Sequence, residues 1–275
     1  MGRNKPKKQR GPRKADKADK FALYEAAVQD PETEMEFVAE VYEELRDRKA
    51  RVLREDFCGS GWAACEWVKR DAKNRAFGVD LDETVLVWGR EKHWNALEPK
   101  QRSRVQLVLG DVLATQTEPA DITVAMNFSY WIFKQRAQLL EYFRAVRDGL
   151  AKDGIFVMDA YGGYEAFQDE YIEKRKVDGF TYVWEQEDYD PVSGDYVCHI
   201  SFRFPDGSAL QRAFSYHWRL WTLPEIRELL QEAGFSEVNV WWQGEDEDGE
   251  GDGEFEPVER GDADPAWICY LVAER

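Results

Sequence analysis

The sequence of 275 residues predicts an α/β fold: a doubly wound, mixed seven-stranded sheet whose last strand is antiparallel. Short apolar runs alternate with amphipathic stretches from residue 51 to residue 160, which is the pattern of a parallel sheet with helices on both faces. Residues 179–221 instead form three alternating, aromatic-rich segments, which indicates an antiparallel β lid inserted after the fifth strand. The final apolar run follows a loop rather than a crossover helix, so it predicts an antiparallel end to the sheet.

The elements of the parallel part follow one another at short intervals. A helix is predicted over 32–49, where apolar residues recur at helical spacing. The helix over 135–150 carries Leu139, Leu140, Phe143 and Val146 on one face, so we expect that face to pack against the sheet. Strands are predicted at 51–55, 75–80, 104–111, 121–128 and 154–160, and further helices at 62–70 and 83–97.

Turn residues and a capping motif divide the second half of the chain. The segments 190–194 and 205–208 are rich in Asp, Pro, Gly and Ser, and they separate the three inserted strands. Thr222 to Glu225 form a capping box with a proline in the first turn, so a helix begins there, and Gly234 is placed to end it. Strands at 236–242 and 266–274 complete the sheet.

Charge is distributed unevenly along the chain. Residues 1–20 hold nine basic and two acidic residues and are expected to form a disordered tail, whereas 21–275 form one domain with a net charge of −24. Such an acidic body repels nucleic-acid backbones, although the tail could dock RNA or an acidic partner. The sequence has no apolar run long enough to cross a membrane and no secretory signal, and its four cysteines are interpreted as reduced, which together predict a cytoplasmic protein.

A second acidic segment lies in the loop over 243–265. Eleven acidic residues stand between Glu245 and Asp264, against one arginine. Asp246, Asp248 and Glu250 partly match a calcium-binding loop, but Pro257 occupies the twelfth position, where such a loop needs a glutamate. We therefore expect a solvated acidic loop and predict no metal site.

The most informative motif is REDFCGSGWAA, residues 54–64, together with Asp80, which follows Gly59 by 21 residues. Glycines at 59 and 61 allow a tight turn and a close approach of the backbone to a ligand. An acid about 20 residues later, at the tip of the next strand, is placed to bind ribose hydroxyls. The motif predicts a site for an adenosine-containing cofactor. Cys58, within the turn, is interpreted as a small filler rather than a nucleophile.

The GSGWAA segment also matches the dinucleotide pattern of Rossmann-like folds, so NAD is an alternative to S-adenosylmethionine (SAM). Three features favour SAM. Glu55, with Asp56 beside it, could hold an ammonium group but would repel a pyrophosphate. Asp111, after the third strand, can accept from an adenine amino group. The antiparallel final strand is unusual for nicotinamide-binding folds.

On these residues the segment 33–275 resembles the class I SAM-dependent methyltransferase family. The resemblance implies that Glu55 contacts the methionine end of the cofactor, that Gly59 and Gly61 line the turn, that Asp80 binds the ribose and that Asp111 lies by the adenine. Further cofactor-binding residues are predicted at Asp56, Leu81, Val112 and Asn127. The chain departs from the family at Phe57, where the family carries its first glycine.

The acceptor side is predicted from the segments after strands four and five. Asn127 to Tyr130 (NFSY) stand where amine-modifying methyltransferases carry N-P-P-Y, which favours a nitrogen acceptor, although Asn127 could also be a simple turn residue. His217 is the first candidate for a general base, followed by Tyr130 and Asp159. Substrate contacts are predicted for Tyr130, Trp131, Tyr161, Tyr216, Trp218 and Arg219.

The resulting hypothesis is SAM-dependent methyl transfer to a small-molecule acceptor in a pocket covered by the lid, at nitrogen or alternatively at oxygen. The first alternative is an RNA or ribosomal-protein methyltransferase docked by residues 1–20. The others are a non-catalytic SAM-binding protein and an NAD-dependent enzyme.

Overall fold

The computed structural model describes residues 11–245 and 251–275, and contacts between residues divide it into two units. The larger unit comprises 30–168, 190–195 and 218–275, and the smaller comprises 11–29, 169–189 and 196–217. The described residues that precede Asp30 therefore belong to the same unit as most of the inserted strands. Within the described ranges, no helix combines the length and apolarity needed to cross a membrane.

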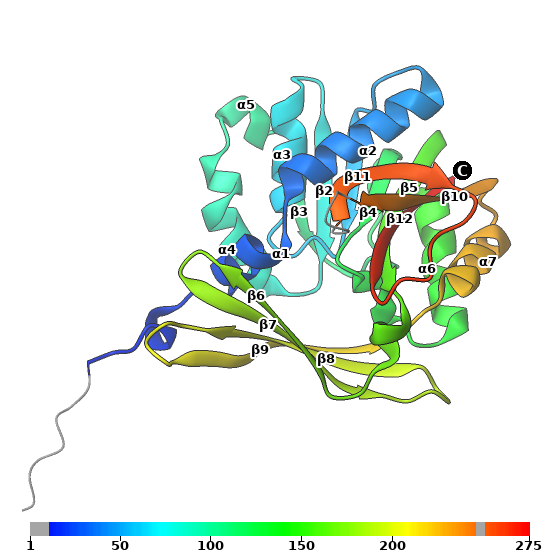
Figure 1. The fold of residues 1–275 in the computed structure, drawn as a ribbon. Helices are drawn as coiled ribbons and strands as arrows, with labels where there is room; N and C mark the ends of the chain where they lie inside the picture. The colour runs from blue at the N-terminus through cyan, green and yellow to red at the C-terminus, as the bar shows by residue number, and fades with distance from the viewer. Residues whose placement is uncertain (1–10, 246–250) are drawn as a thin grey trace, which may run out of the picture. The chain divides into compact units, whose positions relative to one another are not determined.

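An eight-stranded sheet forms the centre of the larger unit, in the order β11-β10-β12-β5-β4-β1-β2-β3 (Figure 1). The strands from β5 to β3 in this order run parallel, and β12, β10 and β11 each run antiparallel to their neighbours. The strands are β1 (Val52–Asp56), β2 (Arg75–Asp80), β3 (Val105–Leu109), β4 (Ala120–Ala125), β5 (Leu150–Gly162), β10 (Glu237–Glu245), β11 (Gly251–Val258) and β12 (Trp267–Glu274).

Helices cover both faces of this sheet. Successive residues of β1 point to opposite faces, so this strand contacts helices on each side. Leu53 packs in the core with α2 and α3, whereas Asp56 accepts a hydrogen bond from Tyr142 of α6. Next to α6 lies α7, whose capping box at Thr222 and C-cap Gly234 form as predicted. The α-helices of this unit are α2 (Pro31–Arg46), α3 (Trp62–Arg70), α4 (Glu83–Lys92), α5 (Pro99–Arg102), α6 (Arg136–Gly149) and α7 (Leu223–Ala233).

The smaller unit is an antiparallel sheet in the order β6-β7-β8-β9, with helix α1 (Lys20–Val28). Its apolar core joins Phe180, Tyr182 and Phe202 of the sheet to α1, where the rings of Tyr24 and Phe214 lie 5.0 Å apart. Three strands were predicted and are present, as β7 (Phe180–Tyr189), β8 (Asp195–Arg203) and β9 (Ala209–Arg219). The fourth, β6 (Tyr171–Val177), was missed because its side chains are mostly charged and exposed.

Two segments predicted to lack structure are partly ordered. In the basic tail, residues 15–17 form a 3-10 turn, and the backbone N–H groups of Lys14 and Ala15 donate to Asp206 and Ser208 at 2.8 and 3.1 Å. Residues 1–10 lie outside the described part of the chain.

In the acidic loop, β11 pairs with β10 and makes the sheet eight-stranded rather than seven-stranded. The ring of Phe255 lies 4.6 Å from that of Tyr270 and 5.7 Å from that of Phe37. The packing of this aromatic side chain thus stabilises a segment that was predicted to be a loop from its acidic residues. The calcium-like residues Asp246, Asp248 and Glu250 lie outside the described residues.

Candidate functional site

The glycine turn between β1 and α3 is built from left-handed backbone conformations. Phe57, Gly59 and Gly61 have φ angles of 57°, 53° and 67°. A side chain makes this region costly, so Phe57 is strained in a position where glycine is free. Its ring packs 5.5 Å from Tyr142 and 6.0 Å from Phe133, and these contacts offset the strain. Phe57 therefore adopts a left-handed conformation that glycine would adopt without strain.

Asp80 closes this turn from the end of β2. Its Oδ2 accepts from the Gly59 N–H at 2.7 Å and its Oδ1 from the Asp82 N–H at 2.8 Å. The Leu81 N–H is a third backbone donor to this carboxylate, and a carboxylate has about four lone-pair sites, so it can still accept a further hydrogen bond. A Cβ at Gly59 would meet nothing within 4 Å, and the neighbouring Leu81 side chain is 66% exposed. The turn therefore offers an acid, open space and an apolar surface side by side.

Buried carboxyl groups surround the turn. Burial raises the pKa of Glu55 to about 8, although the Ala64 N–H donates to it at 2.9 Å, and the nearby Glu34, Asp80 and Asp56 raise it further. Burial also raises the pKa of Glu34 to about 8, with Asp159 as the largest charged contributor. Such pKa values mean that these carboxyl groups tend to keep their protons near neutral pH, and a cationic ligand would favour their ionisation whereas a phosphate would oppose it.

Asp159 of β5 holds the turn that follows β4. Asn127 and Phe128 both have a φ of 57°, and their N–H groups donate to the two oxygens of Asp159 at 2.8 and 2.9 Å. Burial nevertheless raises the pKa of Asp159 to about 7. Asn127 is thus a turn residue here, held at the same strand ends as the glycine turn. Two adjacent non-glycine residues in this conformation mark a strained segment of the kind found at functional sites.

Aromatic rings gather around this second turn. The ring of Tyr161 lies 4.7 Å from Phe128 and 4.9 Å from Trp131, and Trp131 lies 5.8 Å from Trp218. Trp131 and Trp218 are buried, whereas Tyr161 and Phe128 are partly exposed. The last two are therefore the better candidates for contact with a ligand.

Tyr130, the second candidate base, lies in the interior. Its side chain is fully buried and its hydroxyl donates to the backbone carbonyl of Asp159 at 2.9 Å. Burial, followed by the charge of Asp159, raises the Tyr130 pKa well above its ordinary value, which favours the protonated phenol. Its roles as a base and as a substrate contact stay predictions.

The other predicted acceptor residues are divided between the two units. Arg219 of the larger unit stacks 3.8 Å above the Trp221 ring and donates to Glu225 at 2.8 Å, which ties it to the start of α7. Tyr216 and His217 belong to the smaller unit, where the Tyr216 ring lies 6.2 Å from Trp184 and His217 is exposed. The role of His217 as a base and the lid function of this unit stay predictions.

Asp56 is bound to two neighbouring side chains, and its predicted ligand role stays a prediction. It is 1% exposed, and its oxygens accept from Arg54 Nε at 2.7 Å and from the Tyr142 hydroxyl at 3.0 Å. Cys58 is buried as well, and burial raises the pKa of its thiol well above the usual range. A Cβ at Gly78 would lie 2.9 Å from its Sγ, so Cys58 is a space-filling residue.

Asp111 follows β3 and is exposed. The Leu113 N–H donates to its Oδ1 at 2.9 Å, and the carbonyl of Val112 accepts from Arg54 Nη2 at 2.8 Å. Arg54 therefore links β1 to the turn that carries Asp111. Sequence reasoning missed this residue, although an arginine within an otherwise buried strand is itself an unusual signal.

Gly89 in α4 is a second residue that the sequence analysis missed. A Cβ at this position would lie 1.9 Å from the carbonyl oxygen of Ser60, so the helix backbone rests directly on the glycine turn. The signal was an isolated glycine inside a helical segment, which often marks a close backbone contact.

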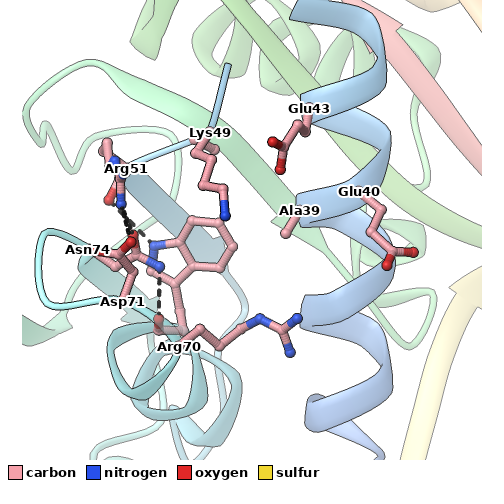
Figure 2. A pocket seen from close by; sticks show the side chains of 10 residues that line it. Ala39, Glu40, Glu43, Lys49, Arg51, Arg70, Asp71 and Asn74 are labelled. Carbon is pink, nitrogen blue, oxygen red and sulfur yellow. Dashed lines mark hydrogen bonds and ion pairs between the residues drawn. The ribbon is translucent and has the colours of Figure 1, made fainter. Parts of the chain in front are cut away.

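A hollow of about 380 Å³ lies at the opposite end of the sheet, between α2 and α3 and next to Arg51 at the start of β1. Figure 2 shows Glu40, Glu43 and Lys49 around it, and Arg51 bonded toward Asp71 and Asn74. These groups neutralise one another, and the hollow faces the amino ends of the parallel strands. Ligands of such sheets bind at the carboxyl ends, so the hollow is not the candidate site.

No family model matches this chain, and no curated protein matches it in sequence. Solved structures do match. A SAM-dependent methyltransferase from Clostridium acetobutylicum aligns with a TM-score of 0.68 at 19% identity, over 93% of this chain and 97% of that one. SAM-bound CalS10, an amino pentose methyltransferase from Micromonospora echinaspora, aligns with a TM-score of 0.65 at 17% identity, over 93% and 95%. The sugar N-methyltransferase KedS8 from Streptoalloteichus aligns with a TM-score of 0.61 at 18% identity, over 100% and 99%.

The chain has the SAM-dependent methyltransferase fold. The alignments extend over nearly the full length of each neighbour, so the resemblance is not confined to a common core. The predicted methyltransferase fold, a mainly parallel sheet with an antiparallel end, is therefore confirmed by the strand order and by these neighbours.

Proposed function

We propose that this protein is a SAM-dependent methyltransferase that acts on a small molecule at nitrogen. The observation that carries the proposal is the contact between Asp80 and the Gly59 N–H at the edge of an acidic region. This contact links Asp80, the proposed ribose-binding acid, to a glycine turn that has open space beside Gly59. The full-length match to SAM-dependent methyltransferases supports the same conclusion.

The charges of the site fit SAM better than NAD. SAM carries an ammonium and a sulfonium group, whereas NAD carries a pyrophosphate that needs positive or N–H-rich surroundings. Burial raises the pKa of three carboxyl groups in the site, those of Glu34, Glu55 and Asp159. Neighbouring acidic residues raise the pKa of Glu34 and Glu55 further. A cationic ligand would favour ionisation of these carboxyl groups and pair with them, whereas a pyrophosphate would oppose their ionisation.

Each part of the cofactor has a candidate partner. Asp80 is placed for the ribose hydroxyls, Leu81 for the face of the adenine and Asp111 for its amino group. Glu55 supplies negative charge for the ammonium at the start of α3. When bound, SAM supplies an electrophilic methyl group on a sulfonium. The chain's contribution is to align an acceptor with that methyl group and to exclude water.

The nitrogen acceptor rests on the acidity of the second turn. A protonated amine must lose a proton before it can attack, and Asp159, with a pKa of about 7, is suited to hold the cation and to take that proton near neutral pH. Phe128, whose N–H donates to Asp159, and Tyr161 form a partly exposed aromatic pair, and such rings can contact a cationic amine. Two structural neighbours are described as amino pentose and sugar N-methyltransferases.

Calorimetry with S-adenosylhomocysteine (SAH) and with NAD tests the cofactor, and transfer of radiolabelled methyl from SAM to amino sugars tests the reaction. We expect SAH to bind and NAD not to bind. Binding of NAD alone would overturn the proposal. Binding of SAH without transfer to any amine or alcohol acceptor would favour the non-catalytic alternative.

A further inference from the structure

A buried arginine connects β1 to the turn that follows β3. Arg54 is 5% exposed, and its guanidinium makes three contacts. Nε pairs with Asp56 at 2.7 Å, Nη2 donates to the Val112 carbonyl at 2.8 Å, and Nη1 donates to the Thr115 carbonyl at 2.8 Å. The planar fork of a guanidinium can hold several acceptors at once, which an ammonium cannot do with the same geometry.

The turn itself is organised around Asp111. The backbone carbonyl of Asp111 accepts from the N–H groups of Ala114 and Thr115 at 3.1 and 2.8 Å. The Leu113 N–H donates to the Asp111 side chain at 2.9 Å. The peptide between Val112 and Leu113 is therefore fixed at both ends, by Arg54 at its carbonyl and by the Asp111 carboxylate at its N–H. Rotation of this peptide would turn the carboxylate with it.

The arginine is itself held in one orientation. Asp56 pairs with it and also accepts from the Tyr142 hydroxyl at 3.0 Å. A buried ion pair costs desolvation, and well-packed apolar side chains could often replace it without loss of stability. The structure therefore shows a buried ion pair whose guanidinium also binds two carbonyl groups of the turn that carries Asp111.

We propose that Arg54 is a positioning residue for adenine recognition: it holds the 111–115 turn so that Asp111 presents a free lone pair to the adenine amino group. This inference rests on the proposed function, because it assumes that adenosine binds at this turn. It assigns selectivity for adenine to a residue of β1 that makes no contact with the ligand itself.

The test compares SAH with S-inosylhomocysteine, in which a carbonyl replaces the adenine amino group. Asp111 accepts from the amino group but repels the carbonyl, so the wild type should prefer SAH by roughly 10- to 100-fold. Arg54→Lys keeps a positive charge beside Asp56 but cannot reach both turn carbonyls. We expect it to reduce the preference to a few-fold, mainly by weakening SAH, and to speed amide hydrogen exchange at Ala114 and Thr115.

Arg104→Lys is the matched control. Arg104 likewise donates to backbone carbonyls of a turn, those of Asp71 and Asn74, but at the amino end of the sheet. Its preference for SAH should equal that of the wild type. Tyr142→Phe is a milder second variant, since it keeps Arg54 and removes only one contact of Asp56, and it should lower the preference by a smaller factor.

The outcomes distinguish failure of the proposed function from failure of the positioning role alone. A wild type that binds neither nucleoside overturns the proposed function and this inference with it. A wild type that prefers SAH, with variants that weaken both ligands equally, leaves the function standing and overturns the positioning role. Arg54→Lys with an unchanged preference and unchanged exchange would overturn it as well.

Discussion

Asp80 allows the proposed cofactor site to be tested most directly, because a single carboxylate both closes the glycine turn and faces the open space above it. We consider Asp80→Asn, which preserves the size of the side chain and removes its charge. In the structure both oxygens accept from backbone N–H groups, Gly59 at 2.7 Å and Asp82 at 2.8 Å. The amide oxygen can retain one of these contacts, whereas the amide NH₂ would face the other donor.

The magnitude follows from the type of bond that is lost. The ribose hydroxyls would lose a charged acceptor, and a hydrogen bond to a charged group contributes about 1.5–3 kcal/mol. At about 1.4 kcal/mol per factor of ten, the Kd for SAH should rise roughly 10- to 150-fold. A partial release of the Gly59 N–H would move the result toward the upper end of this range.

The assay is titration calorimetry with SAH near neutral pH, together with urea unfolding to establish that the variant is folded. Asp71→Asn is the matched control, since Asp71 also accepts a backbone N–H, from Lys73 at 2.8 Å, and pairs with Arg51 at the far end of the sheet. Its SAH affinity should equal that of the wild type. A folded Asp80→Asn protein whose affinity changes less than about twofold would refute the assignment of Asp80 to the ribose.

Four further predictions concern packing, protonation, the tail and the base. Gly89→Ala would place a methyl group 1.9 Å from the Ser60 carbonyl oxygen. It should therefore lower the free energy of unfolding in urea by about 1–3 kcal/mol and weaken SAH binding. An unchanged stability and affinity would mean that the glycine turn can move away without cost. Because the folded pKa of Glu55 is raised from 4.5 to about 8, the free energy of unfolding should fall as the pH rises from 4.5 to 8. In the same pH range SAH binding should release protons. Calorimetry in buffers of different ionisation enthalpy measures this proton release, and equal heats in all buffers would contradict it. Removal of residues 1–10 should leave transfer to small acceptors unchanged, whereas loss of a salt-sensitive RNA activity would favour the RNA alternative. Because Asp159 is the proposed base, His217→Ala should retain full turnover; lowered turnover at unchanged SAH affinity would make His217 the base instead.

Local patterns were enough to predict the parallel strands, the helices between them and the capping box at Thr222, because each depends on residues that are near one another in the sequence. The strands that were missed show where such patterns fail. In β6 the charged, exposed side chains obscure the alternation of polar and apolar residues that marks a strand. In β11 the acidic residues suggest a loop, and the strand is stabilised by the packing of Phe255 against Tyr270 and Phe37, which are distant in the sequence. Pairing with a neighbouring strand stabilises both segments, and sequence spacing does not show that neighbour.

The candidate site divides in the same way. The contact of Asp80 with Gly59 could be expected from their spacing, because a strand–turn–helix followed by a strand brings those two positions together. Asp56 was assigned a ligand role from its place beside Glu55, yet adjacent residues of a strand face opposite sides, and Asp56 points to Arg54 and Tyr142. Which side of the sheet faces the ligand is a property of the whole sheet.

The sequence by itself determined the layered fold and the nature of the glycine turn, since periodicity, glycine and capping residues act over a few neighbouring positions. Only the tertiary structure decided that Phe57 adopts a left-handed backbone conformation, that Glu34 lies near Glu55 and that Arg54 contacts the turn of Asp111. Each of these depends on burial and on partners distant in the chain, and the free-energy cost of a strained backbone or a buried charge is set by those partners.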